Sequence, residues 1–365
     1  MERISLNLKD RSYDILVSEG ALASLKNEVV RLNLEKYSAV VVSNRKICSL
    51  HRDYLEPYLE IFKESLFLEV ADSEKSKSWQ VLFDLLRSTV EFSKAESVLF
   101  IAFGGGVIGD LVGFLAAIYK RGVPFIQIPT TLLAQVDSSI GGKVAIDLKW
   151  GKNLLGAFYQ PRLVLSDLNF LKSLPPRELS NGLSEIIKYG ILGDSGLFEL
   201  LESENEDPSS FSLSLWSEIV SRCSRIKTSL VERDERDSED VRIVLNLGHT
   251  IAHAIETVFD YERVSHGEAV SFGLVVESLI ANKIGVLKEK DLKRVISLIL
   301  KFKTLPRINR KIEQKKILDS ILYDKKAKFG AIRFVLPNSI GSAAVSSDLD
   351  KTLITSALSE GLSYL

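Results

Sequence analysis

The chain has 365 residues, of which 45% are hydrophobic, and a formal net charge of -1 at pH 7. This length allows two domains, because single hydrophobic cores stop growing at about 250–300 residues. Lys and Arg are balanced by Asp and Glu and form no basic arm, which argues against a nucleic-acid-binding protein. The two cysteines, Cys48 and Cys223, are too few for a disulfide framework, and a reducing compartment fits that number.

Nothing in the sequence indicates export or membrane insertion. The first residues lack the basic and then apolar pattern of a signal peptide. No run approaches the roughly 18 apolar residues that cross a bilayer. We therefore expect a cytoplasmic protein without a membrane partner.

The first half of the chain alternates strand-like and helical segments. Alternating strands and helices are typical of a parallel α/β sheet. The strand-like runs are 3–8, 13–17, 38–43, 66–70, 97–103, 124–129 and 164–167, and the helical patterns between them are 21–32, 78–92 and 111–119.

The strand-like runs cease after residue 167, and Leu174-Pro175-Pro176 marks a boundary. The sequence therefore predicts an α/β domain over residues 1–173 and an all-α C-terminal domain over residues 174–365. The helices expected in the second domain are 178–190, 195–203, 214–233, 249–259, 268–284 and 288–300.

A glycine turn, Gly104-Gly-Gly-Val-Ile-Gly-Asp110, follows one of these strands and opens a helix. Glycines let the backbone approach a pyrophosphate, and the helix N-terminus offers N–H groups and a positive dipole end. A tight turn without a ligand is the alternative. The turn follows a late strand, and no acidic residue lies about 20 positions on, so a standard dehydrogenase layout is not expected. Asp72 or Glu74 could replace the missing acid.

Two stretches, Thr130–Lys143 and Gly151–Gly156, repeat small residues, hydroxyls and lysines without the apolar spacing of a core helix. This composition predicts a set of loops that binds anions. Solvated lysines are the alternative. A later pair, Lys325-Lys326, could likewise lie near a site or on the surface.

Three of the four histidines lie in two short runs. His249 and His253 are four apart in a helical pattern, so both should project from one face, and His266 follows after a turn. Catalytic zinc usually has three protein ligands, so this spacing predicts a metal site, although phosphate binding or capping remains open. Glu185 lies among apolar residues, where a carboxylate must be paired or metal-bound. It is a candidate ligand, with pairing to Lys188 as the alternative.

Together these runs resemble the 3-dehydroquinate synthase family over nearly the whole chain. The motifs that carry the resemblance are Glu74-x-x-Lys77, Gly104–Asp110, Pro129–Lys143, Gly151-Lys-Asn153, Glu185-x-x-Lys188, Asn246-Leu-Gly-His249 and His266-Gly-Glu268. The resemblance implies a Rossmann-like NAD-binding domain over 1–173, a helical metal- and substrate-binding domain over 174–365, and a homodimer. It implies NAD and a divalent metal, zinc or cobalt, as cofactors.

The activity that the resemblance implies is the conversion of 3-deoxy-D-arabino-heptulosonate 7-phosphate to 3-dehydroquinate and phosphate, in the shikimate pathway to aromatic amino acids. In that reaction NAD transiently oxidises a ring hydroxyl, and phosphate is eliminated. The hydride is then returned, the ring opens, and an intramolecular aldol reaction closes the carbocycle. No net oxidation results.

The resemblance also implies roles for individual residues. It assigns the metal to Glu185, His249 and His266, and moves His253 from the metal to phosphate binding and proton handling. It assigns NAD to Asn44, Glu74, Lys77, Gly104, Gly105, Gly106, Asp110, Thr130 and Thr131, with Lys143 and Lys152 also near the cofactor. It assigns the substrate's hydroxyls and carboxylate to Asp137, Lys143, Lys188, Lys227, Arg242 and Asn246, and its phosphate to Lys152, Asn153, His253 and Lys326, with Arg121 reaching in from a second subunit.

The sequence departs from the family pattern in a few places. The stretch Asp234–Asp240 is one residue longer than usual and lacks the glycine before Arg242, so the insertion bears on the position of that arginine. Asn181, Ser184 and Ser18 are smaller departures.

Three other interpretations remain open. Other sugar-phosphate cyclases use the same cofactors, and metal-dependent alcohol dehydrogenases such as glycerol dehydrogenase have a related architecture. A catalytically silent NAD-binding protein with a structural zinc is the third. A dehydrogenase would not need lysines and an asparagine for a substrate phosphate, and a closed structural zinc site would need a fourth ligand, which the sequence does not offer.

Overall fold

The computed structural model describes residues 1–93, 97–259, 263–307, 314–327, 333–347 and 349–365, without the side chains of 322–327. By internal packing the chain forms two compact units. The first unit comprises Met1–Pro175 and Phe211–Arg236, and the second comprises Pro176–Ser210 and Asp237–Leu365. Helix α7 (Leu213–Arg233) therefore packs as part of the first unit, and the boundary at residue 173 stays a prediction.

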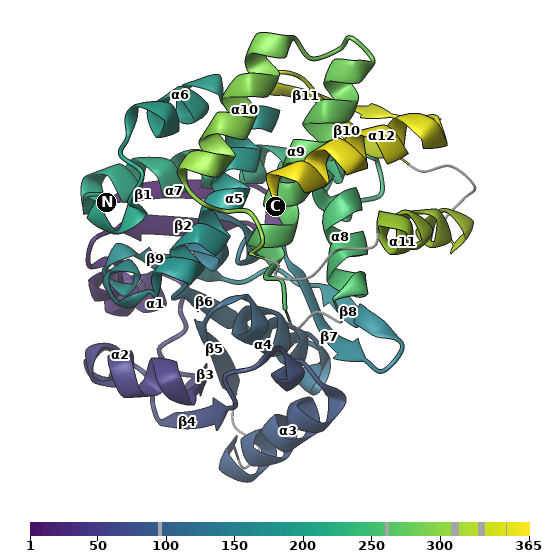
Figure 1. The fold of residues 1–365 in the computed structure, drawn as a ribbon. Helices are drawn as coiled ribbons and strands as arrows, with labels where there is room; N and C mark the ends of the chain where they lie inside the picture. Colours follow the sequence, from purple (N-terminus) through teal and green to yellow (C-terminus); the bar gives the residue numbers. More distant parts are fainter. Residues whose placement is uncertain (94–96, 260–262, 308–313, 328–332, 348) are drawn as a thin grey trace. The chain divides into compact units, whose positions relative to one another are not determined.

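Within the described residues, seven strands of the first unit form one sheet in the order β1-β2-β9-β6-β5-β3-β4 (Figure 1). β1 and β2 are antiparallel, and every other neighbouring pair is parallel. This confirms the parallel α/β fold. The strands are β1 (Glu2–Leu6), β2 (Tyr13–Ser18), β3 (Ser38–Asn44), β4 (Ser65–Val70), β5 (Val98–Gly104), β6 (Phe125–Pro129) and β9 (Leu163–Asp167).

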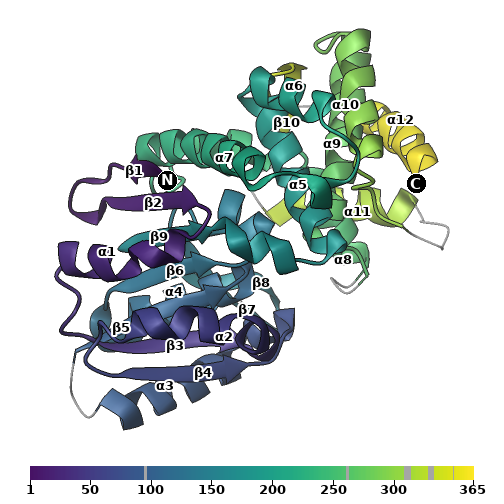
Figure 2. The same cartoon turned by 90° about the vertical axis from the view of Figure 1, so that its left-hand side faces the viewer.

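The central strands β3 and β5 are apolar along nearly their whole length because helices cover both faces of the sheet (Figure 2). Val40 and Phe100 point into the core beneath α3 and α4, whereas Val41 and Ile101 point into the core beneath α1 and α2. The four helices are α1 (Leu25–Arg31), α2 (Arg45–Leu59), α3 (Trp79–Ser93) and α4 (Gly106–Ile118).

The winding direction of the sheet reverses between β3 and β5. From β3 the chain passes to β4 on one side and then returns to β5 on the other. Open α/β sheets bind ligands outside the carboxyl ends of the strands at such a point. Asn44 ends β3 and Gly104 ends β5, so the glycine turn lies at the reversal. The turn does follow a late strand, β5, as the sequence indicated, and strand order rather than chain order places it at the reversal.

Of the two stretches predicted as anion-binding loops, 151–156 lies in strand β8 (Gly151–Phe158), which pairs with β7 (Lys143–Leu148) in an antiparallel ribbon. Most of 130–143 precedes that ribbon and includes a short π-helix, Ala134–Ser138. Val144 and Ile146 are buried against the α3–α4 side of the core, which gives β7 a strand's alternation. The surrounding glycines, lysines and hydroxyl residues hid that alternation in the sequence.

Most of the second unit is helical. Helix α9 is buried around most of its circumference, as expected of a helix at the centre of a bundle, and α5, α8, α10 and α12 all pack against it. The helices are α5 (Pro176–Leu192), α6 (Ser195–Ser203), α8 (His249–Val258), α9 (His266–Lys283), α10 (Glu289–Lys301), α11 (Gln314–Ala327) and α12 (Lys351–Gly361). No helix in the described part of the chain is long and apolar enough to cross a membrane.

The second unit also contains an antiparallel ribbon that the sequence analysis did not anticipate. It consists of β10 (Phe334–Ser339) and β11 (Ser342–Ser346), with Gly341 at φ 89° in the turn between them. A two-residue turn with a left-handed glycine is a common hairpin connection. Both strands are short and β11 is mostly exposed, so the apolar–polar alternation that would reveal them in the sequence is weak.

Close packing of α4 against the β7–β8 ribbon leads to a prediction about stability. A Cβ on Gly113 would lie 2.4 Å from Val144 Cγ1, so Gly113→Val should overpack this contact and lower the free energy of unfolding by about 1–3 kcal/mol. Ala117→Val, on a partly exposed position of the same helix, is the matched control and should change it much less. Chemical denaturation compares the two, and equal effects would contradict the packing described here.

Candidate functional site

The glycine turn meets two threonines in the first unit. The Thr130 backbone N–H donates to the Gly104 carbonyl at 3.0 Å. A Cβ on Gly105 would lie 3.0 Å from Thr131 Cγ2, so a side chain there would press on the threonine. Helix α4 begins directly after Gly105, and its first N–H groups have no partner within the helix itself. The structure thus brings Gly104, Gly105, Thr130 and Thr131 together at a helix N-terminus that suits a phosphate group.

A charged cluster in the same unit joins residues predicted for the cofactor with residues predicted for the substrate phosphate. Lys77 is 4% exposed, and its Nζ donates to Asp110 Oδ2 at 2.7 Å and to Asn153 Oδ1 at 2.6 Å. Burial lowers the pKa of Lys77, but the carboxylate of Asp110 outweighs that effect and raises it. Lys152 Nζ lies 3.3 Å from Glu74 Oε1. The ammonium group of Lys77 is therefore held in place by the side-chain oxygens of Asp110 and Asn153.

Other predicted residues of the first unit are also held by their neighbours. Asn44 Oδ1 accepts from the Ile47 backbone N–H at 2.8 Å, and its Nδ2 donates to Asp72 Oδ1 at 2.9 Å. Lys227, on α7, is 6% exposed and lies 2.9 Å from Asp137 Oδ1. It also donates to the Asp137 carbonyl at 2.7 Å.

Three further predicted residues lie near these elements. Gly106 is the first residue of α4, and a Cβ there would lie 2.9 Å from Ser138 Oγ. Lys143 begins β7 and is exposed. Arg121 is exposed, and its φ of 69° is left-handed, a conformation that non-glycine residues seldom adopt.

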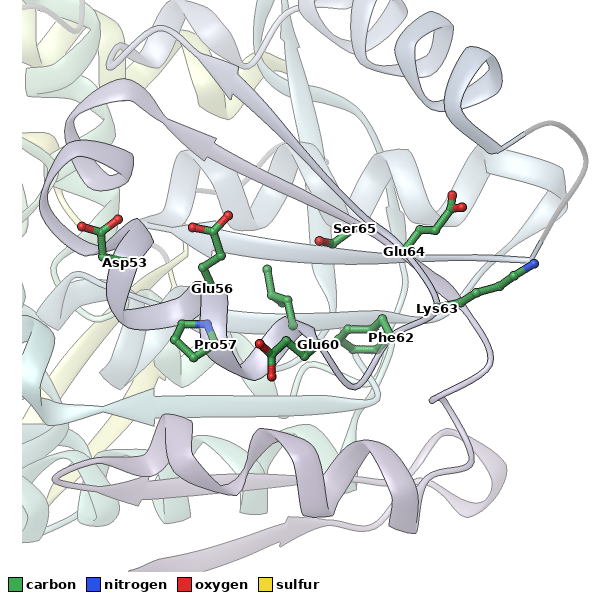
Figure 3. Close-up of a pocket in the computed structure, with 9 residues that line it drawn as sticks. Asp53, Glu56, Pro57, Glu60, Phe62, Lys63, Glu64 and Ser65 are labelled. Carbon is green, nitrogen blue, oxygen red and sulfur yellow. The ribbon is translucent and has the colours of Figure 1, made fainter.

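The first unit also has an open surface groove of about 680 Å³, formed by the end of α2 and the start of β4 (Figure 3). Four of its nine lining residues are acidic, and none of the nine is a predicted site residue. The residues are Asp53, Glu56, Pro57, Leu59, Glu60, Phe62, Lys63, Glu64 and Ser65.

In the second unit the carboxylate of Glu185 is the centre of the predicted metal site. Glu185 lies on α5 and has no exposed surface (0%). Lys188, one turn later and 2% exposed, forms an ion pair with its Oε2. Its Oε1 lies 3.5 Å from His249 Nε2 and 3.2 Å from His266 Nε2. One oxygen therefore faces a lysine, and the other faces two imidazoles.

The far nitrogen of each imidazole faces an acceptor. His249 Nδ1 lies 3.1 Å from the Leu247 carbonyl, and His266 Nδ1 lies 3.2 Å from Glu256 Oε1. A carbonyl and a carboxylate only accept, so each Nδ1 donates, and each Nε2 is left to bind a metal. Single ligand atoms of Glu185, His249 and His266 lie within 4.8 Å of one another. Two imidazoles and a carboxylate suit zinc or cobalt, so the three residues fit a divalent metal.

The two histidines have opposite protonation tendencies. Burial lowers the pKa of His249 to about 3, and Lys188 adds to that effect, so this imidazole is neutral at physiological pH. Burial also lowers the pKa of His266, but hydrogen bonds to Glu185 and Glu256 outweigh it and raise the pKa to about 10. Without a metal, a proton therefore occupies the position on His266 that a metal would take.

Local sequence places the two imidazoles. Gly248, at φ 83°, precedes His249 at the start of α8, and a Cβ on Gly273 of α9 would lie 1.8 Å from the Gly248 carbonyl oxygen. The beginning of α8 is thus seated against α9. Ser265 caps α9, which makes His266 its first residue. Both imidazoles therefore stand at helix starts with a fixed backbone.

The remaining predicted residues of the second unit are less closely grouped. Arg242 is 3% exposed and begins a short 3-10 helix that ends at Asn246, whose side chain is exposed. His253 is exposed on α8, with its ring centroid 5.7 Å from that of His249. It lies outside the three-residue group that could hold a metal. Lys326 belongs to α11, and its side chain lies outside the described residues.

The insertion before Arg242 has an unusual backbone. Asp237 and Asp240 have left-handed φ values of 52° and 60°, and Asp240 Oδ1 accepts from Arg333 at 2.8 Å. Aspartates adopt this conformation more readily than most residues, so the stretch forms left-handed turns without a glycine. Arg242 follows in a buried position.

Two departures from the family pattern make contacts next to the candidate metal ligands. Asn181 Oδ1, one turn before Glu185 on α5, accepts from the Gly267 backbone N–H at 2.5 Å. Ser184 Oγ lies 2.8 Å from Ser271 Oγ inside the bundle. Both departures therefore link α5 to α9.

Sequence reasoning missed Glu256, whose carboxylate contacts His266. A signal was present. His249, His253 and Glu256 follow one another at intervals of four and three, which places them on one face of a helix. Asn181 was noticed only as a departure.

The chain combines two features. Its α/β unit has a glycine turn at the reversal of the sheet, and its helical unit groups two histidines and a glutamate as possible metal ligands. Sugar-phosphate cyclases and metal-dependent alcohol dehydrogenases have this architecture. Comparison with known proteins identifies the family to which the chain belongs.

Residues 67–181 match the model of the 3-dehydroquinate synthase N-terminal region, and residues 182–327 match that of the 3-dehydroquinate synthase C-terminal region. A curated 3-dehydroquinate synthase of Pelobacter propionicus is 40% identical over 97% of this chain and 98% of its own length. The chain belongs to the 3-dehydroquinate synthase family.

Solved structures of two synthases are also similar. A 2-deoxy-scyllo-inosose synthase complexed with carbaglucose-6-phosphate, NAD+ and Co2+ has a TM-score of 0.88 and 25% identity, covering 99% of this chain and 100% of that one. ValA, the 2-epi-5-epi-valiolone synthase of Streptomyces hygroscopicus, with NAD+ and Zn2+ bound, has a TM-score of 0.86 and 27% identity, covering 100% of both chains.

The geometry around Glu185 leads to a prediction about metal content. His249→Ala should raise the metal dissociation constant by more than about 100-fold, because it removes one of three ligands. His253→Ala should keep the metal, because His253 lies outside the group. His51→Ala, which changes the fourth histidine in the other unit, is the matched control. Metal analysis after dialysis compares them, and retention by His249→Ala or loss by His253→Ala would contradict the assignment.

Proposed function

We propose that the chain converts 3-deoxy-D-arabino-heptulosonate 7-phosphate into 3-dehydroquinate and phosphate, a step of the shikimate pathway. The observation that carries this proposal is the buried Glu185 carboxylate, with one oxygen facing two imidazoles whose far nitrogens are hydrogen-bonded. Membership of the family, with 40% identity to a curated synthase over nearly the full length, supports the same activity.

In this proposal NAD binds at the glycine turn of the first unit. The free N–H groups at the start of α4 favour its pyrophosphate, and no side chain at Gly105 or Gly106 obstructs the approach. Asn44 stands at the end of the neighbouring strand β3, at the reversal of the sheet. The Lys77–Asp110 pair adds a fixed charge, and Thr130 and Thr131 complete the wall of the turn.

In the second unit, Glu185, His249 and His266 would hold a divalent metal. When bound, the metal supplies Lewis acidity at a substrate oxygen, and NAD supplies a reversible hydride acceptor. Lys188 neutralises the second oxygen of Glu185 and keeps the carboxylate in place. Because Lys188 is buried beside the two imidazoles, its charge also favours the neutral form of His249.

Cationic and amide side chains of the chain would bind the two anionic groups of the substrate. In the first unit, Lys152 and Asn153 are proposed for the phosphate, while Lys227, fixed by Asp137, is proposed for the carboxylate end. In the second unit the corresponding proposals are His253 and Lys326 for phosphate, and Arg242 and Asn246 for the hydroxyls and carboxylate. Charge-assisted hydrogen bonds from positioned groups such as these can contribute several kcal/mol to catalysis.

We also propose that the chain acts as a homodimer in which Arg121 reaches the substrate of the partner subunit. The exposure of Arg121 and its left-handed backbone support this role, because a non-glycine residue held in that conformation must be fixed by its surroundings. Mixing an Arg121→Ala chain with a chain inactivated at Lys188 should restore part of the activity if the arginine acts across subunits. No restoration, with mixed dimers present, would contradict it.

The proposed activity predicts phosphate release from 3-deoxy-D-arabino-heptulosonate 7-phosphate that requires catalytic NAD and is abolished by a chelator. Absorbance at the NADH wavelength should show no net accumulation, because the hydride returns to the intermediate. A dehydrogenase would accumulate NADH in proportion to turnover. Absence of phosphate release from folded, metal-loaded protein would contradict the substrate and favour one of the related cyclase reactions.

The raised pKa of His266 predicts that metal binding displaces a proton. At pH 7.5 the metal-free imidazole of His266, with a pKa of about 10, is protonated, whereas His249, with a pKa of about 3, is not. Metal binding should therefore release about one proton and strengthen as pH rises from 6.5 to 9. Calorimetry in buffers of different ionisation enthalpy measures this number. Release of two protons, or affinity independent of pH, would contradict the assignment.

A further inference from the structure

Glu256 is a buried carboxylate for which the family-based assignments give no role. It lies on α8, seven residues after His249, and is 7% exposed. A carboxylate in such a place is stable only with hydrogen-bonding or charged partners. Its Oε1 lies 3.2 Å from His266 Nδ1. This contact links α8 to the first residue of α9.

The contact lies on the far side of the imidazole from Glu185. His266 Nε2 faces Glu185 Oε1 at 3.2 Å, and the two nitrogens lie on different edges of the ring. A metal on Nε2 is therefore out of reach of the Glu256 carboxylate. The ligand group found among the described residues accordingly contains Glu185, His249 and His266 but not Glu256.

We propose that Glu256 is a positioning residue of the metal centre: its carboxylate accepts the Nδ1–H of His266, which fixes the tautomer and ring orientation that present Nε2 to the metal. The inference rests on the proposed function only in assuming that a metal binds here. A hydrogen-bond acceptor behind a ligating imidazole keeps the ring and its tautomer in place, so metal affinity depends on it.

The two imidazoles are supported differently. His249 Nδ1 faces the neutral carbonyl of Leu247, whereas His266 Nδ1 faces the charged carboxylate of Glu256. The peptide support of His249 survives any side-chain substitution at position 247. The support of His266 depends on one side chain, so it can be removed and restored by mutation.

α8 thus serves both ligands. Its first residue, His249, is one of them, and its Glu256, two turns later, orients the other. Because both lie on one rigid helix, their spacing holds the relative positions of the two imidazoles. The seven-residue spacing of His249 and Glu256 therefore fixes one imidazole relative to the other, which the four-residue spacing of His249 and His253 does not.

The test measures the dissociation constant of the full-length protein for Zn2+ by chelator competition, and records the d–d absorption of the Co2+ form. Glu256→Ala should raise the dissociation constant by about 10–100-fold and alter the Co2+ spectrum, because His266 loses its fixed orientation. Glu256→Gln should recover most of the affinity and the wild-type spectrum, because its amide oxygen can still accept from Nδ1–H.

A matched control is Glu360→Ala, which removes a carboxylate that pairs with Lys283 at the other end of α9, at 2.8 Å. It should leave affinity and spectrum unchanged. If Glu256→Ala does not fold, Glu256→Gln still decides, because a purely electrostatic role predicts that it fails and the positioning role predicts that it binds.

Wild-type affinity and spectrum in Glu256→Ala would overturn the inference while leaving the proposed function intact. Glu256→Gln as defective as Glu256→Ala would also overturn it, because acceptance from Nδ1 would not be what matters. If the wild-type protein binds no Zn2+ or Co2+ tightly, the metal part of the proposed function fails, and the inference fails with it.

Discussion

A carboxylate with no exposed surface must be charge-compensated, and in this protein that requirement organises the second unit around Glu185. Lys188 compensates one oxygen from the same helix. The other oxygen faces His249 and His266, which come from two different helices. Helices α5, α8 and α9 therefore have to meet at one point. The packing of α5 and of α8 against α9 is consistent with that constraint.

The same constraint explains why glycines occur where α9 meets α5 and α8. The absence of a side chain at Gly273 leaves room for the Gly248 carbonyl. Gly267 lies against Asn181, and a Cβ on Gly267 would be 2.3 Å from the Asn181 backbone oxygen. Larger residues would separate the helices and move the imidazoles away from the carboxylate. The departures Asn181 and Ser184 add hydrogen bonds between α5 and α9 at this place, so they strengthen the contact instead of disturbing it.

The sequence was sufficient for the elements whose patterns are strong and local. The buried runs of β3 and β5, the glycine turn and the boundaries of α6 and α8 follow from composition and periodicity. Strand order was not predictable from those patterns, and it is strand order that places Gly104 at the reversal of the sheet. The β7–β8 ribbon was missed because glycines and lysines interrupt its alternation.

For the candidate site, spacing alone grouped three histidines, whereas the structure groups two of them with Glu185. The difference arises because α5 lies far from α8 and α9 in the sequence, and helical periodicity says nothing about contacts between helices. The apolar surroundings of Glu185 made it a candidate ligand, and the resemblance to the family moved His253 out of the group. It did not supply Glu256 or Asn181, whose contacts appear only once the backbone is folded.

The most direct test of this account is the anomalous diffraction of crystals of the zinc-loaded protein. We expect one strong peak in the second unit, about 2.0–2.2 Å from Glu185 Oε1, His249 Nε2 and His266 Nε2. His266 Nδ1 should still contact Glu256. A peak that includes His253 as a ligand, or that lacks one of the three predicted atoms, would contradict it.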